Sequence, residues 1–382
     1  MKTIFILMMG FFLSQPLMAH HPQGKRKGSL KIGIFPHHVA TGDFNKDGKA
    51  DLAIPASGSE HVSILMGDGK GGALSNHNFP VGIGPVWIEI ADFDNDGKLD
   101  WVTSNTGSSN LTFYFGDGKG GFAGRRNLEN IPGAPSLVAR DFDQDGRVDL
   151  AVVQIKLSRL LILGNGGKAN FTRRATYPLQ PASHIMDTAD LNQDGLPDLI
   201  VGSLIDHSLT VFLGKKGGGF EKAIVNKVGK LPHYRVYGDW NRDGHLDAAV
   251  TVGGLEGVQV LQGDGKGHLE PVALLHSGVN PHGLSVGDFN ADGVDDLAVV
   301  NRSTKDLVIF LGDAKGKFKL YRKFPLGADV ITLAANDFDG DGILDLALVV
   351  ASADRLRIFR GLGNGSFNPF PLQQDAQGSG GE

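Results

Sequence analysis

The sequence predicts an all-β protein, a seven-bladed β-propeller of four-stranded antiparallel blades closed by N- and C-terminal strands in the last blade. Three observations predict this fold. A nine-residue acidic segment recurs seven times, and its first Asp lies 49 residues after the previous one throughout, from Asp43 to Asp337. Each repeat contains four short apolar stretches separated by polar or Gly-rich turns, and the two ends of the repeat array are complementary parts of one strand. A fixed period of this length is typical of repeat architectures such as propellers.

The second repeat illustrates the four expected strands. Residues 87–91 and 101–103 flank the acidic segment as the first and second strands, residues 111–115 form the third, and the fourth begins at Phe122. Short connections between such stretches are typical of an antiparallel blade. A Gly-rich turn precedes the fourth strand, and we expect it to recur at Gly67, Gly116, Gly164, Gly214, Gly263, Gly312 and Gly361. A large apolar residue opens the fourth strand in six of the seven repeats, which suits contact between neighbouring blades.

The ends of the repeat array predict how the ring closes. The chain passes Phe367 and ends its last repeat where a fourth strand would begin, at residues 367–370. Residues 30–34 align with residues 79–83, which are the end of that same strand in the next repeat. We therefore expect the N-terminal segment to complete the seventh blade, so that a strand from each terminus holds the ring closed.

The sequence divides into four parts. Residues 1–19 resemble a secretory signal peptide, with Lys2 before a short apolar run that is too short to span a bilayer. Residues 20–28 read as a linker, residues 29–372 as the propeller and residues 373–382 as a disordered tail. The chain contains no Cys, so it has neither a lipid attachment site nor disulfides. We expect a protein that is secreted, periplasmic or held at the cell surface.

The acidic segment follows the pattern Asp-x-(Asp/Asn)-x-Asp-Gly-x-x-Asp. Side-chain oxygens at positions 1, 3, 5 and 9 converge when the chain turns tightly at the Gly of position 6, and position 7 can add a backbone carbonyl. Such an all-oxygen shell is what Ca²⁺ prefers, whereas Mg²⁺ requires smaller octahedra and Zn²⁺ prefers nitrogen or sulfur. Positions 1, 3, 5 and 9 of these segments hold 24 of the 42 acidic residues. Asp-Gly turns also favour hairpins without any metal, but seven complete copies in register favour a cation that offsets the repulsion of the carboxylates.

We therefore expect up to seven Ca²⁺ ions, one per blade. The ligand positions are Asp43, Asn45, Asp47, Lys49 and Asp51; Asp92, Asp94, Asp96, Lys98 and Asp100; Asp141, Asp143, Asp145, Arg147 and Asp149; Asp190, Asn192, Asp194, Leu196 and Asp198; Asp239, Asn241, Asp243, His245 and Asp247; Asp288, Asn290, Asp292, Val294 and Asp296; and Asp337, Asp339, Asp341, Ile343 and Asp345. Position 2 is apolar in every copy and should anchor the loop to its blade.

The repeat resembles the FG-GAP/VCBS repeat of integrin-α-type β-propellers. The resemblance rests on residues 42–51 and their six equivalents, together with the Gly-Asp-Gly-Lys-Gly turns, and it covers about residues 29–372. It implies seven blades with Ca²⁺ between the first and second strands. The signatures of WD40 and kelch propellers are absent. This family includes adhesion receptors, lectins and exported bacterial proteins, so the resemblance does not fix a function.

A candidate ligand site lies at the start of the inner strands. His37, His184, His233 and His282 share one repeat position, and His38, Trp87 and Tyr234 lie one place later. In an antiparallel blade these residues fall on the face opposite the metal loops, around the channel mouth. Such a set can bind a sugar, an acidic peptide or a transition metal. It can equally be a way of starting the inner strand, with His binding backbone groups.

These features favour a non-enzymatic binding or adhesion module whose ligand is a glycan or an extracellular protein. No Cys nucleophile, His-Glu-x-x-His helix, Gly-x-Ser-x-Gly elbow or phosphate loop is present. The alternative is a carbohydrate-active enzyme, a polysaccharide lyase or hydrolase, that uses groups such as His233, Tyr234, Arg235 and Asp187. The net charge of −5 gives no reason to expect nucleic acid as a partner, and no segment reads as transmembrane. We expect a monomer.

Overall fold

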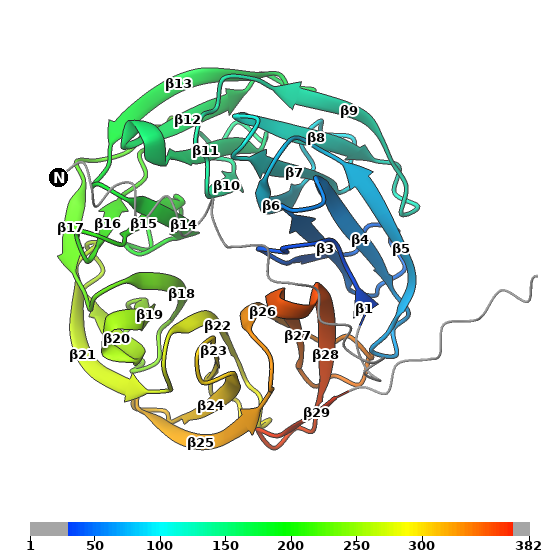
Figure 1. Cartoon of the computed structure of the whole chain (residues 1–382). Helices are drawn as coiled ribbons and strands as arrows, with labels where there is room; N and C mark the ends of the chain where they lie inside the picture. Colours follow the sequence, from blue (N-terminus) through cyan, green and yellow to red (C-terminus); the bar gives the residue numbers. More distant parts are fainter. Residues whose placement is uncertain (1–29, 370–382) are drawn as a thin grey trace, which may run out of the picture.

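The computed structural model describes residues 30–369, which form a closed ring of seven blades around a central axis (Figure 1). Each blade is an antiparallel sheet whose strands run outward from the axis in sequence order. No α-helix occurs in this part of the chain, and its helical residues are three short 3₁₀ turns, η1 (Ile155–Leu157), η2 (Gly253–Leu255) and η3 (Ala351–Ala353). The predicted fold class is confirmed. The predicted signal peptide (1–19), linker (20–28) and tail (373–382) lie outside the described residues.

The first strand of each blade lines the axis. These strands are β2 (Ala40–Gly42), β6 (Pro85–Ala91), β10 (Leu137–Arg140), β14 (Ser183–Ala189), β18 (Pro232–Gly238), β22 (Pro281–Gly287) and β26 (Val330–Asn336).

The second strand is buried along its whole length in every blade, because it packs against neighbouring blades on both faces. It also begins at the ninth residue of the acidic segment each time. These strands are β3 (Asp51–Ala56), β7 (Asp100–Asn105), β11 (Asp149–Gln154), β15 (Asp198–Ser203), β19 (Asp247–Val252), β23 (Asp296–Asn301) and β27 (Asp345–Val350).

The outer two strands complete each blade. The third strands are β4 (His61–Gly67), β8 (Asn110–Gly116), β12 (Arg159–Asn165), β16 (Ser208–Phe212), β20 (Gly257–Gly263), β24 (Asp306–Gly312) and β28 (Arg355–Gly361). The fourth strands of the first six blades are β5 (Ala73–Pro80), β9 (Phe122–Leu128), β13 (Phe171–Pro178), β17 (Ile224–Lys227), β21 (Leu269–His276) and β25 (Phe318–Pro325).

The seventh blade is closed from both ends of the chain, as the sequence predicts. β29 (Phe367–Pro369) pairs with one end of β28 at Phe359–Gly361, and β1 (Leu30–Lys31) pairs with its other end at Leu356 and Arg355. The two segments therefore share the place of a single fourth strand. Ile32 follows β1 into a buried cluster that contains Leu356 and Ile358, and its backbone N–H donates to the carbonyl of Asp354 at 3.0 Å.

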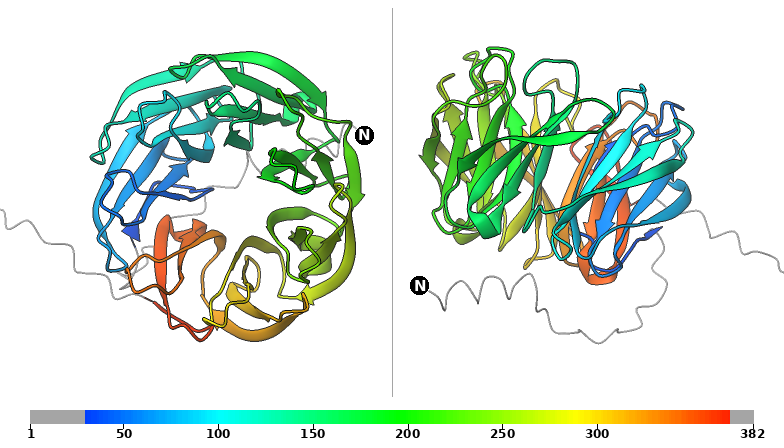
Figure 2. Two further views of the ribbon diagram at one scale, coloured as in Figure 1. Left: turned by 180° about the vertical axis from the view of Figure 1, so that it is seen from behind. Right: turned by 90° about the horizontal axis from the view of Figure 1, so that it is seen from above.

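Apolar contacts between neighbouring blades form the core. The position-2 residue of each acidic segment is buried, and it meets the residue that opens the fourth strand of the next blade. Phe44 contacts Phe122 edge-on with ring centroids 5.2 Å apart, and Phe289 contacts Phe367 in the same way at 5.6 Å. This confirms the predicted contact between neighbouring blades at the start of the fourth strand. The position-2 residue packs against the next blade as well as its own, as Phe93 does against Phe171 and Phe113. The turns at the two ends of the strands form the two faces of the ring (Figure 2).

Candidate metal loops and the axial side-chain cluster

Each acidic segment folds as a tight loop between the first and second strands, and the second loop illustrates its geometry. Asp92 accepts the backbone N–H of Asp96 at 3.1 Å through Oδ1 and that of Gly97 at 2.7 Å through Oδ2. Asp96 accepts the N–H of Lys98 at 3.0 Å. Gly97 has a φ of 80°, and Asn95 at position 4 also lies in the left-handed region with a φ of 61°. Gly suits the first conformation and Asn tolerates the second, so the local sequence favours this turn.

The Asp at position 9 is the buried anchor of the loop. Asp100 accepts the N–H of Phe93 at 2.9 Å through Oδ2 and that of Gly116, at the end of the third strand, at 2.8 Å through Oδ1. Burial raises the pKa of Asp100 to about 6, and the neighbouring carboxylates Asp94 and Asp92 raise it further against the two backbone donors. An Asp at this position can bind a metal ion with both of its oxygens. In the structure both bind backbone N–H groups, and each oxygen keeps a second lone pair.

The residues present fit a hard divalent cation. In the three loops with Asp at position 3, three carboxylates offer oxygens that lie within 4.8 Å of one another: Asp92, Asp94 and Asp96; Asp141, Asp143 and Asp149; and Asp337, Asp339 and Asp345. Like charges this close repel, and an all-oxygen donor set suits Ca²⁺.

Four loops have Asn at position 3, and three of them have a different internal bond. Asn192 Nδ2 donates to Asp194 at 2.9 Å, and Asn241 and Asn290 make the equivalent bond to the Asp at position 5. The amide oxygen of Asn192 still accepts the backbone N–H of Asp194, at 3.3 Å, so it faces the interior of the loop. These loops therefore carry one carboxylate fewer and less repulsion than the other three.

Position 4, which the sequence did not single out, connects successive loops. Lys46 Nζ donates to the carbonyl of Gly97 at 2.7 Å, and Asn95 Nδ2 donates to that of Gly146 at 3.0 Å. The Gly-rich turns share this face, since Gly71 N–H donates to the carbonyl of Phe338 in the neighbouring loop at 3.0 Å. The third turn differs from the prediction. Asn165, not Gly164, occupies the shared Gly position, because it is Asn165 that pairs with Phe171 and donates its N–H to Asp149.

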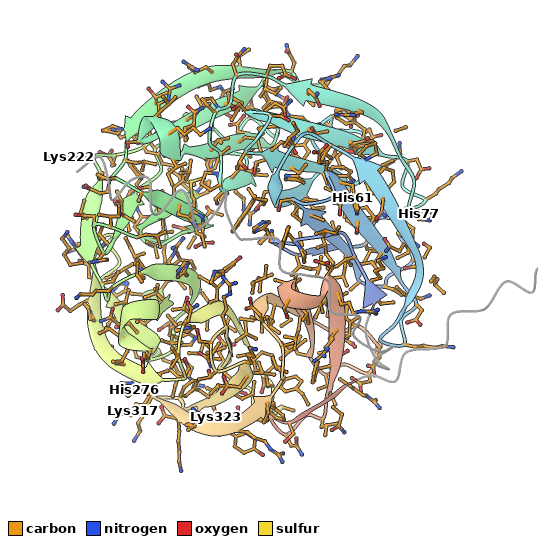
Figure 3. The ribbon with its side chains drawn as sticks, viewed as in Figure 1. His61, His77, Lys222, His276, Lys317 and Lys323 are labelled. Atoms are coloured by element: carbon orange, nitrogen blue, oxygen red, sulfur yellow. The ribbon has the colours of Figure 1, made fainter. Side chains whose placement is uncertain are left out.

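The predicted ligand residues converge on the axis at the opposite end of the inner strands. The rings of His38 and Trp87 stack with centroids 3.9 Å apart, and Trp87 stacks on Tyr234 at 6.4 Å. His282 lies 5.5 Å from Tyr234 and 4.7 Å from His233, also measured between ring centroids. Five of the seven predicted residues therefore form one contact chain that crosses the ring. By contrast, His77 and His276 lie at the outer edge (Figure 3).

The remaining two members of the set, His37 and His184, lie close to this chain. His37 Nε2 is 2.9 Å from Ser57 Oγ, in the turn between the second and third strands of its own blade. Burial lowers the pKa of His184, and the nearness of His233 and His37 lowers it further, so these side chains from three blades lie near one another. Within residues 30–369, the only groups of three or more candidate ligands that meet within metal-binding distance are the Asp groups of the loops. The His set is therefore not a preassembled transition-metal site.

Burial keeps the axial histidines neutral. It lowers the pKa of His37, His38 and His233 to about 4 and that of His184 to about 3. The nearby guanidinium of Arg302 adds to this effect on His37 and His233, while Arg302 itself forms a two-pronged pair with Asp329 at 2.9 and 2.8 Å.

Glu89 is a further axial residue that the sequence analysis missed. Burial raises its pKa to about 7, although Trp87 Nε1 donates to the carboxylate at 3.0 Å. The available signal was a charged residue in an inner strand at a position where the first, third, fifth and seventh blades have Ala or Val.

The groups considered for catalysis are held in structural contacts. Arg235 Nη2 lies 2.6 Å from Asp187 Oδ2, and the Arg235 side chain is fully buried. The same guanidinium donates to the carbonyls of His233 and Ile185, each at 2.9 Å. Asp187 is therefore the counter-ion of a buried arginine.

Seven exposed apolar side chains lie in connections on the face opposite the metal loops. Ile34, Phe35, Ile83 and Val279 lie in the connections between blades, and Leu157, Ile205 and Leu255 lie in the turns between second and third strands. Both kinds of connection belong to this face, because the strands of a blade alternate in direction. Ile83 is the most exposed of the seven at 57%. We call these seven residues the apolar turn face.

Comparison with known proteins places the fold. A model of the FG-GAP-like repeat matches residues 43–103, 141–201, 190–250, 239–299 and 288–348. No curated protein matches the sequence. Similar solved structures include BBS1N in complex with ARL6DN, at 14% identity over 89% of this chain and 100% of that chain, with a TM-score of 0.62. A functionally unknown protein from Desulfotomaculum acetoxidans has 10% identity over 84% of this chain and 99% of its own, with a TM-score of 0.61.

An enzyme has the same fold. A catalytically inactive His-to-Ala variant of virginiamycin B lyase from Staphylococcus aureus, solved with quinupristin, has 12% identity over 87% of this chain and 98% of its own, with a TM-score of 0.59. At these identities the likeness concerns the fold alone. In residues 30–369 no helix is long and apolar enough to span a membrane. The repeat model matches more than half of the sequence, so this chain belongs to the family of proteins with FG-GAP-like repeats.

Proposed function

We propose that this protein is an exported, calcium-binding propeller that acts as a non-enzymatic binding module for an extracellular protein. The observation that carries this proposal is the apolar turn face. Single exposed apolar residues are ordinary on protein surfaces, but seven on the connections of one face are typical of a surface that binds another protein. Connections on a rigid scaffold are also where recognition is usually located.

The fold neighbour BBS1N supports a protein partner. It was solved in complex with ARL6DN, so a propeller of this general architecture binds a protein. The apolar residues Ile34 and Phe35 lie in the segment that joins β1 to the first blade, and a bound partner would cover them together with Ile83. Lys156 and Glu256 lie in the same set of turns and supply polar neighbours, an arrangement common at protein interfaces.

A glycan is the less favoured ligand. Sugar-binding sites commonly offer an exposed aromatic ring, but Trp87 is only 6% exposed because it stacks on His38 and Tyr234. A polysaccharide lyase or hydrolase is disfavoured by the pairing of Asp187 with Arg235.

Calcium would act on the other face of the protein. Bound to the loops, it would supply the positive charge that lets three or four carboxylates remain close together. The loop backbone already orients Asp92, Asp96 and Asp100 through N–H donors, so the chain itself positions the oxygens. The role we assign to Ca²⁺ is to hold the first and second strands together in each blade. Residues 1–19 support export, because they have the pattern of a signal peptide.

The test uses the mature protein in Ca²⁺ to capture a partner from solubilised cell-surface proteins, followed by affinity measurements with the identified partner. Ile83→Glu and Val279→Glu should each weaken binding at least tenfold, which is about 1.4 kcal/mol. Leu74→Glu and Val272→Glu are the matched controls, because these residues are exposed on the fourth strands β5 and β21. Loss of binding in the controls alone would place the interface on the outer edge and refute the proposal.

A glycan array, probed in parallel, distinguishes the alternative. We expect no binding to polysaccharides by the wild-type protein. Glycan binding that is lost when His184, His233 and His282 are replaced by Ala would instead make this a lectin-like module with an axial site. Shortened products after incubation with a polysaccharide would support an enzyme.

A further inference from the structure

In the third metal loop, the guanidinium of an arginine lies among the carboxylates of the loop. Arg174, on β13, forms an ion pair with Asp143 through Nη1. The same Nη1 lies 3.5 Å from Asp149 Oδ2, and Nη2 lies 3.8 Å from Asp145 Oδ2. One guanidinium therefore contacts the carboxylates of positions 3, 5 and 9. These are three of the four side chains that would hold a metal ion.

Two local features bring Arg174 into the loop. β12 and β13 change register between Ile162 and Leu163, which pair with Ala175 and Arg173, so Arg174 is the extra residue of a bulge. The neighbouring residue on β12 is Gly164. A Cβ there would lie 1.8 Å from Arg174 Nε, closer than any real contact. The side chain thus reaches the loop across the backbone of Gly164, and no other residue type leaves that space.

The position-9 carboxylate responds to this arrangement. In five other blades its Oδ2 accepts the N–H of the position-2 residue, as Asp100 does from Phe93. Asp149 Oδ2 is buried and accepts no hydrogen bond within the described residues, and the nearest positive charge is the Arg174 guanidinium. Oδ2 of Asp149 therefore faces the arginine instead of the backbone, while Oδ1 still accepts the N–H of Asn165 at 2.8 Å.

The second loop is the natural comparison, because it has the same four Asp residues. Its equivalent of Arg174 is Arg125, which is exposed on β9 and forms no ion pair within the described residues. In the second blade, Phe115 occupies the position of Gly164, so the space that the Arg174 side chain uses in the third blade is taken by a phenyl side chain. In the seventh loop Arg360 pairs with Asp339 at 2.9 Å and Asp341 at 2.6 Å, but it leaves Asp345 to the backbone. Among residues 30–369, an arginine contacts positions 3, 5 and 9 together only in the third loop.

We propose that Arg174 is the built-in cation of the third loop. Its guanidinium takes the place of a divalent cation, so that this loop stays folded without calcium and binds calcium much more weakly than the second loop. This inference rests on the proposed calcium binding of the other loops. The carboxylates of the loop can bind either the guanidinium or a divalent cation, but the divalent cation must first displace the arginine.

The experiment compares the number of Ca²⁺ ions that the full mature chain binds at a free Ca²⁺ concentration just sufficient to fill the second loop, measured by native mass spectrometry and equilibrium dialysis. Arg174→Gln should bind one ion more than the wild type. Gly164→Ala should do the same, because its methyl group expels the arginine while leaving it in the chain. Arg125→Gln is the matched control and should bind the wild-type number. Equal numbers in the wild type and both third-loop variants would overturn the proposal.

Hydrogen exchange without calcium separates this inference from the calcium proposal. In the wild type, amides of residues 141–149 should exchange more slowly than those of residues 92–100, and Arg174→Gln should remove the difference. If no form binds Ca²⁺, the calcium proposal fails, while a loop destabilised by Arg174→Gln still supports a built-in cation. A loop whose exchange does not change in Arg174→Gln would refute it independently of any metal.

Discussion

The indole of Trp87 and the phenol ring of Tyr234 stack with centroids 6.4 Å apart and 19° between their planes, although they come from the second and fifth blades. The contact crosses the ring, and His38 extends it on the other side of Trp87 at 3.9 Å. Aromatic side chains thus join blades that share no strand pairing. The axis of this propeller is a packed cluster at this level, and the cluster should contribute to the stability of the ring.

We predict that Trp87→Ala destabilises the protein by about 3–5 kcal/mol, because it removes a large buried ring and leaves a cavity. Trp87→Phe should cost clearly less, since a smaller ring can still stack on His38. Urea unfolding followed by circular dichroism measures both. A Trp87→Ala variant within about 1 kcal/mol of the wild type would mean that the axial contacts do not hold the blades together.

Closure of the seventh blade gives the second prediction. Deletion of residues 29–35 removes β1 and the buried side chain of Ile32, so one half of the split fourth strand is lost. We expect a marked fall in the melting temperature, measured by scanning calorimetry. Deletion of residues 373–382 is the control, because they follow the last described strand. If both truncated proteins melted like the intact chain, the ring would not depend on its N-terminal strand.

The repeat predicted most of this architecture because period and register are properties of the sequence. The spacing of 49 residues placed one apolar residue at position 2 of each acidic segment and another at the start of the fourth strand, and the structure brings Phe44 and Phe122 into contact across two blades. Register also placed Trp87 and Tyr234 at the axis. It did not predict which axial side chains stack. That depends on the unequal sizes of the residues that occupy the same repeat position in the other five blades. The sequence did not predict the contact of Arg174 with the third loop. The side chain reaches the loop because of a bulge and because of Gly164, which looks in the sequence like an ordinary turn glycine.

Removal of calcium should destabilise the protein strongly. A site at a hundredfold excess of ion over its Kd contributes about 2.7 kcal/mol, and several loops would lose their ion together. We expect a chelator to lower the melting temperature by about 10 °C or more. Ca²⁺ should restore it, and Mg²⁺ at the same concentration should restore it less, because these flexible oxygen shells suit the larger ion. An unchanged melting temperature in the chelator would contradict calcium binding by the loops.

The lowered pKa values of the axial histidines lead us to expect that the protein loses stability in acid. The folded protein holds the pKa of His37, His38 and His233 at about 4 and that of His184 at about 3, below the ordinary value of 6.5. Between these values the unfolded chain binds more protons than the folded one, so stability is full above pH 6.5 and falls as the pH drops toward 4. Glu89, with its pKa raised to about 7, acts in the opposite sense, and so do the position-9 carboxylates whose pKa burial raises to about 6, such as Asp100.

The measurement is the free energy of unfolding from pH 7 to pH 4 at constant free Ca²⁺. Each histidine contributes at most about 1.4 kcal/mol per pH unit to the slope. His184→Gln combined with His233→Gln should make the curve shallower, because neutral amides replace two groups that the folded ring keeps unprotonated. His77→Gln combined with His276→Gln is the matched control, since these residues lie on the fourth strands β5 and β21 at the outer edge. Carboxylates of the metal loops also titrate in acid, so the decisive quantity is the difference between each variant and the wild type. Equal slopes for the axial and the outer pair would show that the axial histidines do not govern the acid response.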